Sequence, residues 1–558
     1  RLFEQAEPEE VMNKETIEAI EAVAEEVLAT EPKLPVDREP KEVIEVDPGD
    51  VLPAYVAKPG DDAEVVQALE LFQGDELDRF FAALARSDAG VADAVTHVVH
   101  WGDSAIGIDG ITGAIRRRMQ ARFGDSGHGF HLLAPPNTSY RHREIDFRHN
   151  DQWYKCFIIF KCRDDGHYGL GGTTFRSKGG AKSTFRPHPE RSSGRVSLFE
   201  LWYAAKPGGG MITLRVDDGE KIRISTDAES LEDRWHRISV EEGDHTFEVR
   251  AAGEGSVRAY GVTLERSQPG IVWDGLAQIG AFTNRMLEFN AGHLKSQLDH
   301  RKADLAVFMF GGNDMQRRMK MATYESEYRE VIRHVKGARP GMDCLVMAPL
   351  DHGDRVGSRV VSKPVVARMV AAQRAAAKAE GCAFFDTWAA MGGEGSAGRW
   401  YHRKPRLISG DLSHATGKGH QVIGELFYRA LLHSYVEYRT GKKGEISSDP
   451  NDAEADANAK SNAEAKAEEK EASAADKENS DPETKSAEKE ASADQKNSDG
   501  EAKAEENEAI AANKEKSGKE AKAEEKEAIA GENSDEEANA VEQANAVEQA
   551  NAVEQKAN

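Results

Sequence analysis

The sequence predicts an α/β domain whose parallel sheet carries helices on both faces and is interrupted by an inserted antiparallel β-sandwich. From about residue 275, short apolar runs alternate with helical segments, as βαβ units require. Residues 135–268 instead hold many short β-branched and aromatic runs separated by Gly-containing turns such as Asp218-Gly219, which is typical of a sandwich. In a parallel sheet, functional side chains are expected at the carboxyl ends of the strands, here after the apolar runs Val95–Trp101, Leu305–Phe310, Cys344–Ala348 and Ala383–Phe385.

A chain of 558 residues is too long for one ordinary core, so several segments are expected. They are an acidic N-terminal extension with one helix and a Pro-rich linker (1–74), the first part of the α/β domain (75–134), the inserted carbohydrate-module-like β-sandwich (135–268), the second part of the α/β domain (269–443), and an acidic low-complexity tail (444–558).

The acidity of the protein belongs to its two ends. Residues 444–558 carry 33 acidic and 14 basic side chains, and residues 1–50 carry 16 and 5. Since the whole chain has a net charge of -25, the remaining residues 51–443 are weakly basic at +5. The tail repeats Glu-Ala-Lys-Ala-Glu-Glu and has few large apolar residues, so we expect it to be disordered.

Neither a membrane span nor a cofactor site is indicated. No stretch reaches the roughly 18 apolar residues that a transmembrane helix needs, so no integral membrane segment is expected in this chain. Because the chain begins at Arg1, whether a signal peptide or anchor precedes it stays open. The four cysteines match neither a zinc pattern nor a dense disulfide framework, and no metal or organic cofactor is expected. Buried free thiols are the preferred interpretation; a Cys344–Cys382 bridge would require their two strands to be neighbours.

The first candidate catalytic motif is Gly102-Asp103-Ser104. It lies directly after an apolar strand and before a helix with Ile111, Ile115 and Met119 on one face. A serine on such a turn exposes its hydroxyl close to backbone N–H groups that can stabilise an oxyanion. Taken alone, the motif is more often an ordinary turn.

Two further motifs supply the partners that a serine nucleophile needs. The amide of Asn313, in Gly311-Gly312-Asn313-Asp314, can donate to the same oxyanion. In Asp411-Leu412-Ser413-His414, the imidazole can accept the serine proton while the carboxylate fixes its tautomer. Other histidines have no comparable carboxylate partner and are interpreted as structural or exposed, notably His293, His352 and His420.

In this order, the motifs resemble those of the SGNH/GDSL hydrolase family. The first block is matched at Ser104, the second at Gly280 in Gln278-Ile279-Gly280-Ala281, the third at Asn313, and the fifth by Asp411 to His414. The resemblance implies a flavodoxin-like sheet of five parallel strands and a triad of Ser104, Asp411 and His414. It also implies an oxyanion hole made by the Ser104 and Gly280 N–H groups with the Asn313 amide.

The whole arrangement resembles peptidoglycan O-acetylesterases of this family, which carry a β-sandwich between the first and second blocks. The shared text covers roughly residues 75–435 and includes Gly124–Phe130, Pro269–Leu276 and Met391–Ser396 with Trp400. The sequence departs from its relatives at Ala105 and in the basic run Tyr401–Arg406.

The motifs predict a serine esterase that works through an acyl-serine intermediate. The resemblance implies that it removes O-acetyl or similar short acyl groups from a cell-wall or extracellular glycan. The expected partner is an O-acetylated glycan or another small ester, with no nucleic acid, and the resemblance implies an extracytoplasmic location. Two alternatives remain: an O-acetyltransferase that acts on a glycan hydroxyl, and a non-catalytic glycan-binding wall protein. The sandwich is expected either to bind polymeric substrate through cations or only to brace the catalytic domain, the cations being Arg141, Arg143, Lys155, Lys161 and Arg163.

Overall fold

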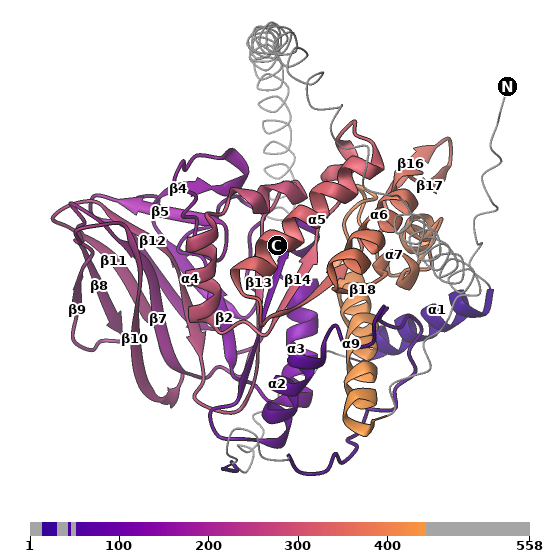
Figure 1. Cartoon of the computed structure of the whole chain (residues 1–558), viewed down its shortest axis with the longest axis horizontal. Coiled ribbons are helices and arrows are strands. Elements are labelled where there is room, and N and C mark those ends of the chain that lie inside the picture. Colours follow the sequence, from indigo (N-terminus) through magenta and orange to yellow (C-terminus); the bar gives the residue numbers. More distant parts are fainter. Residues whose placement is uncertain (1–13, 31–42, 46–51, 442–558) are drawn as a thin grey trace, which may run out of the picture. The chain divides into compact units, whose positions relative to one another are not determined.

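The computed structural model describes residues 14–30, 43–45 and 52–441 (Figure 1). The N-terminal helix expected within residues 10–30 is α1 (Lys14–Ala29), with Ile20, Val23 and Ala24 buried. The Pro-rich linker and the low-complexity tail from residue 444 lie outside the described residues. None of the described helices is long and apolar enough to cross a membrane.

A five-stranded parallel sheet forms the centre of the α/β part. Its spatial order is β13-β1-β14-β15-β18, so in chain order the strands run 2-1-3-4-5, as in doubly wound flavodoxin-like sheets. The register is continuous, with Val95 opposite Gly270 and Val98 opposite Leu305. The strands are β1 (Val95–Gly102), β13 (Gly270–Ala277), β14 (Leu305–Met309), β15 (Asp343–Met347) and β18 (Ala383–Phe385).

Both faces of this sheet are buried because successive side chains of a strand point to opposite sides. In β14, Val307 packs into one apolar core and its neighbours Ala306 and Phe308 into another. The first core is covered by α2 (Asp78–Ala89), α3 (Ile111–Phe123) and α9 (Gly417–Thr440). The second is covered by α4 (Ala291–Arg301), α5 (Met321–Ala338) and α6 (Val365–Glu380), and two short helices complete the set, α7 (Thr387–Ala390) and α8 (Ser396–His402).

Two antiparallel sheets form the inserted region. One has the order β10-β7-β12-β5-β4, with β2 paired to β12, and the other has the order β3-β6-β11-β8-β9. They pack face to face, since the rings of Phe199 and Phe247 stack at 4.8 Å between β7 and β11. The strands are β2 (Gly127–His131), β3 (Ile145–His149), β4 (Tyr154–Phe157), β5 (Thr173–Ser177), β6 (Lys182–Pro187), β7 (Val196–Ala205), β8 (Met211–Val216), β9 (Ile222–Ser225), β10 (Glu232–Gly243), β11 (Phe247–Gly253) and β12 (Val257–Glu265).

The antiparallel region and the α/β part share one core. Trp101 of β1 and Phe130 of β2 belong to the same buried apolar cluster as the interior of the two antiparallel sheets. The antiparallel pairing begins at Gly127, whereas the sequence predicted its start at residue 135. The sequence alone assigned Gly127–His131 to the α/β domain because the strand that pairs with it, β12, lies more than 100 residues downstream.

The expectation of free thiols is wrong. The protein has two disulfides, Cys156–Cys162 and Cys344–Cys382. Cys344 lies in β15 and Cys382 directly precedes β18, and these two parallel strands are neighbours. Cys156 and Cys162 lie on either side of the 3-10 turn η2 (Ile158–Phe160), so a short loop brings them together.

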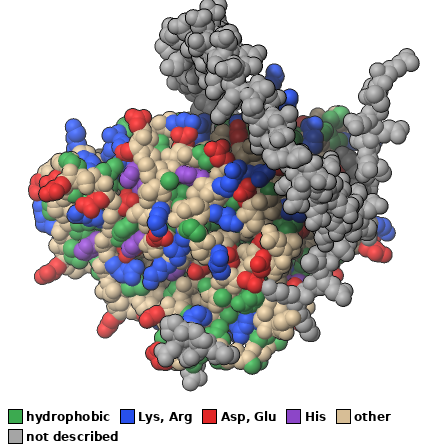
Figure 2. All heavy atoms as spheres, viewed as in Figure 1, with side chains coloured by type: hydrophobic (Ala, Val, Ile, Leu, Met, Phe, Trp, Pro, Cys, Tyr) green, Lys and Arg blue, Asp and Glu red, His purple; other side chains and the backbone are tan. Residues whose placement is uncertain are grey.

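The surface carries charges of both signs. On the face drawn in Figure 2, Lys and Arg side chains are interspersed with Asp and Glu over the described residues. This mixture agrees with the small net charge of the middle of the chain.

Candidate active site

Ser104 lies on the turn that follows β1, the strand between β13 and β14 in the parallel sheet. It is the first residue of the short turn η1 (Ser104–Ile106), at the carboxyl end of β1. The preceding Asp103 accepts a hydrogen bond from the Ala105 amide at 2.9 Å and thereby caps the turn. A Cβ on Gly102 would come within 2.6 Å of the Met309 carbonyl oxygen, so only glycine allows β1 and β14 to approach this closely.

The structure brings Ser104, His414 and Asp411 into one hydrogen-bonded chain. The Ser104 Oγ lies 2.8 Å from His414 Nε2, across 310 residues of sequence. The His414 Nδ1 lies 2.7 Å from the Asp411 Oδ2. This arrangement can activate a serine hydroxyl, because the imidazole can accept its proton while the carboxylate holds the ring.

The loop that carries Asp411 and His414 is held by backbone contacts. Leu412 has φ +61°, an unusual conformation for a branched residue, and its carbonyl accepts the Gly353 amide at 2.8 Å. The Ser409 amide donates to the His414 carbonyl at 2.8 Å. The loop is therefore closed on itself before α9 begins at Gly417.

Hydrogen bonding sets the charge states of the pair. Burial would raise the pKa of the Asp411 carboxyl, but donors from His414, Ser409 and the Ser413 and His414 amides hold it well below its usual range. The hydrogen bond with Asp411 raises the pKa of the His414 ring above 6.5, against the opposing effect of burial. An ionised carboxylate thus faces a histidine that favours its protonated form.

The oxyanion-hole candidates lie on the loops that follow β13 and β14, the strands on either side of β1. Gly280 has φ +86°, which favours glycine, and lies on the loop after β13. Asn313 donates one N–H of its side-chain amide to the Ala281 carbonyl at 3.1 Å, which leaves its second N–H for another acceptor. The neighbouring Asp314 is buried and accepts hydrogen bonds from the backbone and hydroxyl of Thr283, which ties the Asn313 loop to the Gly280 loop.

A cavity of about 160 Å³ opens beside Ser104. Of the residues predicted from sequence, Ser104, Asn313 and His414 line it, and Gly280 and Asp411 do not. Two residues that the sequence did not suggest also line it, His352 and Lys363. His352 follows the parallel strand β15, which is its only sequence signal. Lys363 follows the antiparallel hairpin of β16 (Gly353–Val356) and β17 (Arg359–Ser362), and no sequence motif marks it.

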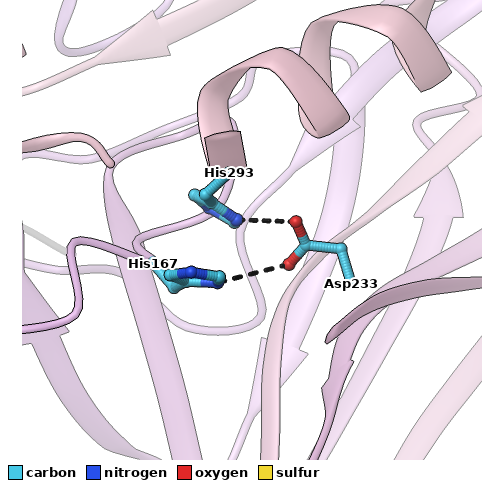
Figure 3. A group of neighbouring side chains, drawn as sticks. All are labelled: His167, Asp233 and His293. Atoms are coloured by element: carbon cyan, nitrogen blue, oxygen red, sulfur yellow. Dashed lines mark hydrogen bonds and ion pairs between the residues drawn. The ribbon is translucent and has the colours of Figure 1, made fainter. Parts of the chain in front are cut away.

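A second group of titratable side chains lies where α4 of the α/β part meets the antiparallel region. His167, Asp233 and His293 place three candidate ligand atoms within 4.8 Å of one another, with both imidazoles facing the carboxylate (Figure 3). His293 Nδ1–H donates to Asp233 at 2.8 Å, and its Nε2 accepts the Gly169 amide at 2.8 Å. Both ring nitrogens of His293 are therefore used within the protein, which does not fit a metal ligand. The expectation that His293 lacks a carboxylate partner is wrong, because Asp233 reaches it from 60 residues away.

Residues 243–422 match the family model described as the GDSL-like lipase/acylhydrolase family. The protein contains a GDSL-like acylhydrolase domain. The resemblance inferred from the sequence is thereby confirmed, and the acylhydrolase is a carboxylic-ester hydrolase. The matched segment includes Gly280, Asn313, Asp411 and His414 but not Ser104. Ser104 lies beside this segment because β1 pairs in parallel with both β13 and β14.

Several solved structures resemble this chain at low sequence identity. A peptidoglycan O-acetylesterase is 20% identical with a TM-score of 0.53, and the alignment covers 63% of this chain and 95% of that one. A family two carbohydrate esterase from Cellvibrio japonicus is 12% identical with a TM-score of 0.21, covering 52% and 99%. The similarity to the peptidoglycan O-acetylesterase supports the fold described above. No curated protein sequence matches the chain.

Proposed function

We propose that the protein is a serine esterase of the SGNH type that removes O-acetyl groups from a cell-wall or extracellular glycan. The observation that carries this proposal is the hydrogen-bonded chain from Ser104 through His414 to Asp411, with distances of 2.8 and 2.7 Å. The five-stranded parallel sheet and its antiparallel insertion support an SGNH domain interrupted by a β-sandwich. The glycan substrate is suggested by the fold shared with the peptidoglycan O-acetylesterase.

In the acylation step, Ser104 Oγ attacks the ester carbonyl carbon and its proton passes to His414 Nε2. The Ser104 and Gly280 N–H groups and the free N–H of Asn313 stabilise the negative charge on the carbonyl oxygen. Asp411 stabilises the imidazolium that forms. The C–O bond to the sugar then breaks, and His414 returns the proton to the departing sugar oxygen.

In the deacylation step, water replaces the sugar. His414 takes a proton from the water while the water oxygen attacks the acyl carbon. The bond between the acyl carbon and Ser104 Oγ then breaks, and His414 returns the proton to Ser104 Oγ. Acetate is released and the free serine is restored. The same residues would transfer the acyl group to a sugar hydroxyl if water were excluded, so the acceptor has to be measured.

The antiparallel region contributes a loop beside this site. Ile159 Cδ1 lies 3.8 Å from the position of a Cβ on Gly280, and the Cys156–Cys162 disulfide closes the loop around it. The adjacent Phe160 is 72% exposed. Lys161 is already paired with Glu288 at 2.5 Å, so the exposed ring is a better candidate than this cation for contact with a glycan chain.

An extracytoplasmic location is part of the proposal. Both pairs of cysteines within residues 52–441 form disulfides, Cys156–Cys162 and Cys344–Cys382. Structural disulfides form and persist in oxidising compartments. This supports a protein that works outside the cytoplasm, where cell-wall glycans are found.

The proposal is tested by the products. The purified protein is incubated with an O-acetylated glycan, and both free acetate and acetylated oligosaccharide are measured by mass. We expect free acetate to dominate and the Ser104→Ala variant to release none. Acetylated oligosaccharide as the main product would make the protein a transferase, and no product with any glycan ester would contradict the glycan substrate.

A further inference from the structure

The catalytic cavity contains a histidine that the proposed mechanism does not use. His352 Nδ1–H donates to the Leu350 carbonyl at 2.9 Å, so in the neutral ring Nε2 is an acceptor. Burial, with Lys363 and His414 nearby, lowers the pKa of this ring, which keeps it neutral. Within residues 52–441, no protein group donates a hydrogen bond to Nε2. Nε2 is therefore a fixed acceptor in the cavity that contains Ser104.

The loop that carries His352 is rigid. The preceding Asp351 is buried and accepts hydrogen bonds from Ser362 Oγ at 2.6 Å, Ser396 Oγ at 3.1 Å and the Ala397 amide at 2.8 Å. A Cβ on Gly312 would lie 3.5 Å from His352 Nε2, so this nitrogen faces the loop that holds Asn313. The acceptor is thus held close to the expected position of the ester.

A cation stands beside this acceptor. Lys363 lines the same cavity, and its backbone amide donates to the His352 carbonyl at 2.7 Å. Its ion pair with Asp354 is long, at 3.6 Å, and both side chains are substantially exposed, so the pair is worth little. Lys363 can therefore exchange Asp354 for an anionic group of a ligand.

Further positive charge lies on and beside the hairpin that precedes Lys363. Tyr401 has the guanidinium of Arg355 at 5.1 Å and that of Arg406 at 4.3 Å from its ring centre. Arg355 lies on β16, whose first residue, Gly353, donates to the catalytic loop at Leu412.

We propose that His352 and Lys363 form a subsite for an acidic sugar, in which Nε2 accepts a hydrogen bond from a sugar hydroxyl and the Lys363 ammonium pairs with a carboxylate. The inference rests on the proposed esterase function and narrows its substrate to O-acylated glycans that carry carboxylates. Hydrogen bonds to charged groups are the strong ones, so the carboxylate supplies most of the selectivity.

The test compares two substrates of equal length, an O-acetylated uronic-acid oligosaccharide and an O-acetylated neutral oligosaccharide. We expect the wild type to prefer the acidic one by about tenfold or more in kcat/KM, since hydrogen bonds to charged groups are stronger than those between neutral groups. Lys363→Ala should bring this ratio close to one. The matched control is Lys221→Ala, an exposed lysine before β9 that does not line the cavity, which should keep the wild-type ratio.

The histidine is tested separately. His352→Leu removes the acceptor and should lower the ratio of kcat/KM for acetylated sugar over 4-nitrophenyl acetate about tenfold, whereas His352→Gln, which keeps an acceptor oxygen, should restore part of it. Melting temperatures identify any variant that fails to fold. Calorimetric titration of the deacetylated acidic oligosaccharide measures the subsite without turnover, with Lys363→Ala expected to weaken Kd about tenfold.

Two results would overturn the subsite: equal kcat/KM values for the two substrates in the wild type, or a wild-type ratio retained in Lys363→Ala. Failure of the wild type to hydrolyse 4-nitrophenyl acetate would instead contradict the esterase function. The calorimetric comparison would then still decide the subsite, because it does not depend on hydrolysis.

Discussion

The buried carboxylate of Asp103 accepts the Gly312 amide at 2.9 Å, across 209 residues of sequence. The same carboxylate accepts the Ala105 amide, so one side chain joins the turn of Ser104 to the loop of Asn313. Burial raises the pKa of Asp103 to about 6. The proposed nucleophile, Ser104, and the proposed oxyanion donor, Asn313, thus lie on loops that a shared residue holds.

Replacing Asp103 should misplace both groups. In Asp103→Ala, two buried N–H groups lose their acceptor, so we expect kcat to fall about 10- to 100-fold and the free energy of unfolding to fall by roughly 1–3 kcal/mol. Asp103→Asn keeps one acceptor oxygen and should lie between this variant and the wild type. Steady-state kinetics on 4-nitrophenyl acetate and urea unfolding measure the two effects; wild-type kcat in Asp103→Ala would rule out the positioning role.

The pH dependence should report on His414. The ring must be neutral to accept the serine proton, so activity rises as the pH increases through its pKa, which Asp411 raises above 6.5. Asp411→Asn removes the charge that favours imidazolium, so the limb should move to lower pH while kcat falls about 10²- to 10⁴-fold. Profiles of kcat/KM against pH are measured for both proteins. If activity rises at the same pH in Asp411→Asn as in the wild type, Asp411 does not set the pKa of His414.

The Cys344–Cys382 disulfide should stabilise the fold without taking part in catalysis. It spans 38 residues, and restriction of the unfolded chain by a loop of this length corresponds to about 4 kcal/mol, with about 2 kcal/mol for the short Cys156–Cys162 loop. The Cys344→Ala/Cys382→Ala double variant should therefore lose more unfolding free energy than the Cys156→Ala/Cys162→Ala variant. Urea titrations give both values, and thiol titration of the unreduced, unfolded wild type should find no free cysteine within residues 52–441; the reverse order of losses would contradict the account.

The exposed ring of Phe160 should affect polymers more than small esters. If it contacts the glycan chain, Phe160→Ala should raise KM for an O-acetylated polymer about three- to tenfold, because partial burial of one exposed ring contributes about 1 kcal/mol. Ile222→Ala is the matched control, since Ile222 is also an exposed apolar residue of the antiparallel region. Equal KM values for all three proteins would leave the region with a bracing role alone.

The sequence predicted the elements that carry their own periodicity. The apolar runs that became β1, β14, β15 and β18 could be read directly, because a parallel strand buried on both faces is apolar throughout. The combination of a parallel sheet with antiparallel sheets could be predicted because residues 135–268 hold many short β-branched and aromatic runs, whereas apolar runs alternate with helical segments after about residue 275. The serine, asparagine and histidine motifs were visible because each follows a strand or precedes a helix.

Long-range partners could not be predicted in the same way. The Asp233 that pairs with His293 and the strand that pairs with Gly127–His131 are distant in sequence, and no local pattern marks them. Free thiols were preferred because the four cysteines have no framework spacing. The Cys344–Cys382 bridge was left open on the condition that its strands are neighbours, which the adjacency of β15 and β18 fulfils, whereas the Cys156–Cys162 bridge was not predicted. His352 carried no motif, and its position in the cavity follows from the fold.

The most direct test of the central claim is the rate of 4-nitrophenyl acetate hydrolysis by Ser104→Ala, with Ser139→Ala, an exposed serine outside the cavity, as the control. We predict that kcat/KM of Ser104→Ala lies at least a thousandfold below wild type, roughly the loss expected when a nucleophile is removed, while its melting temperature is unchanged. The Ser139→Ala control should have the wild-type rate. A rate for Ser104→Ala within about tenfold of wild type would contradict the serine mechanism.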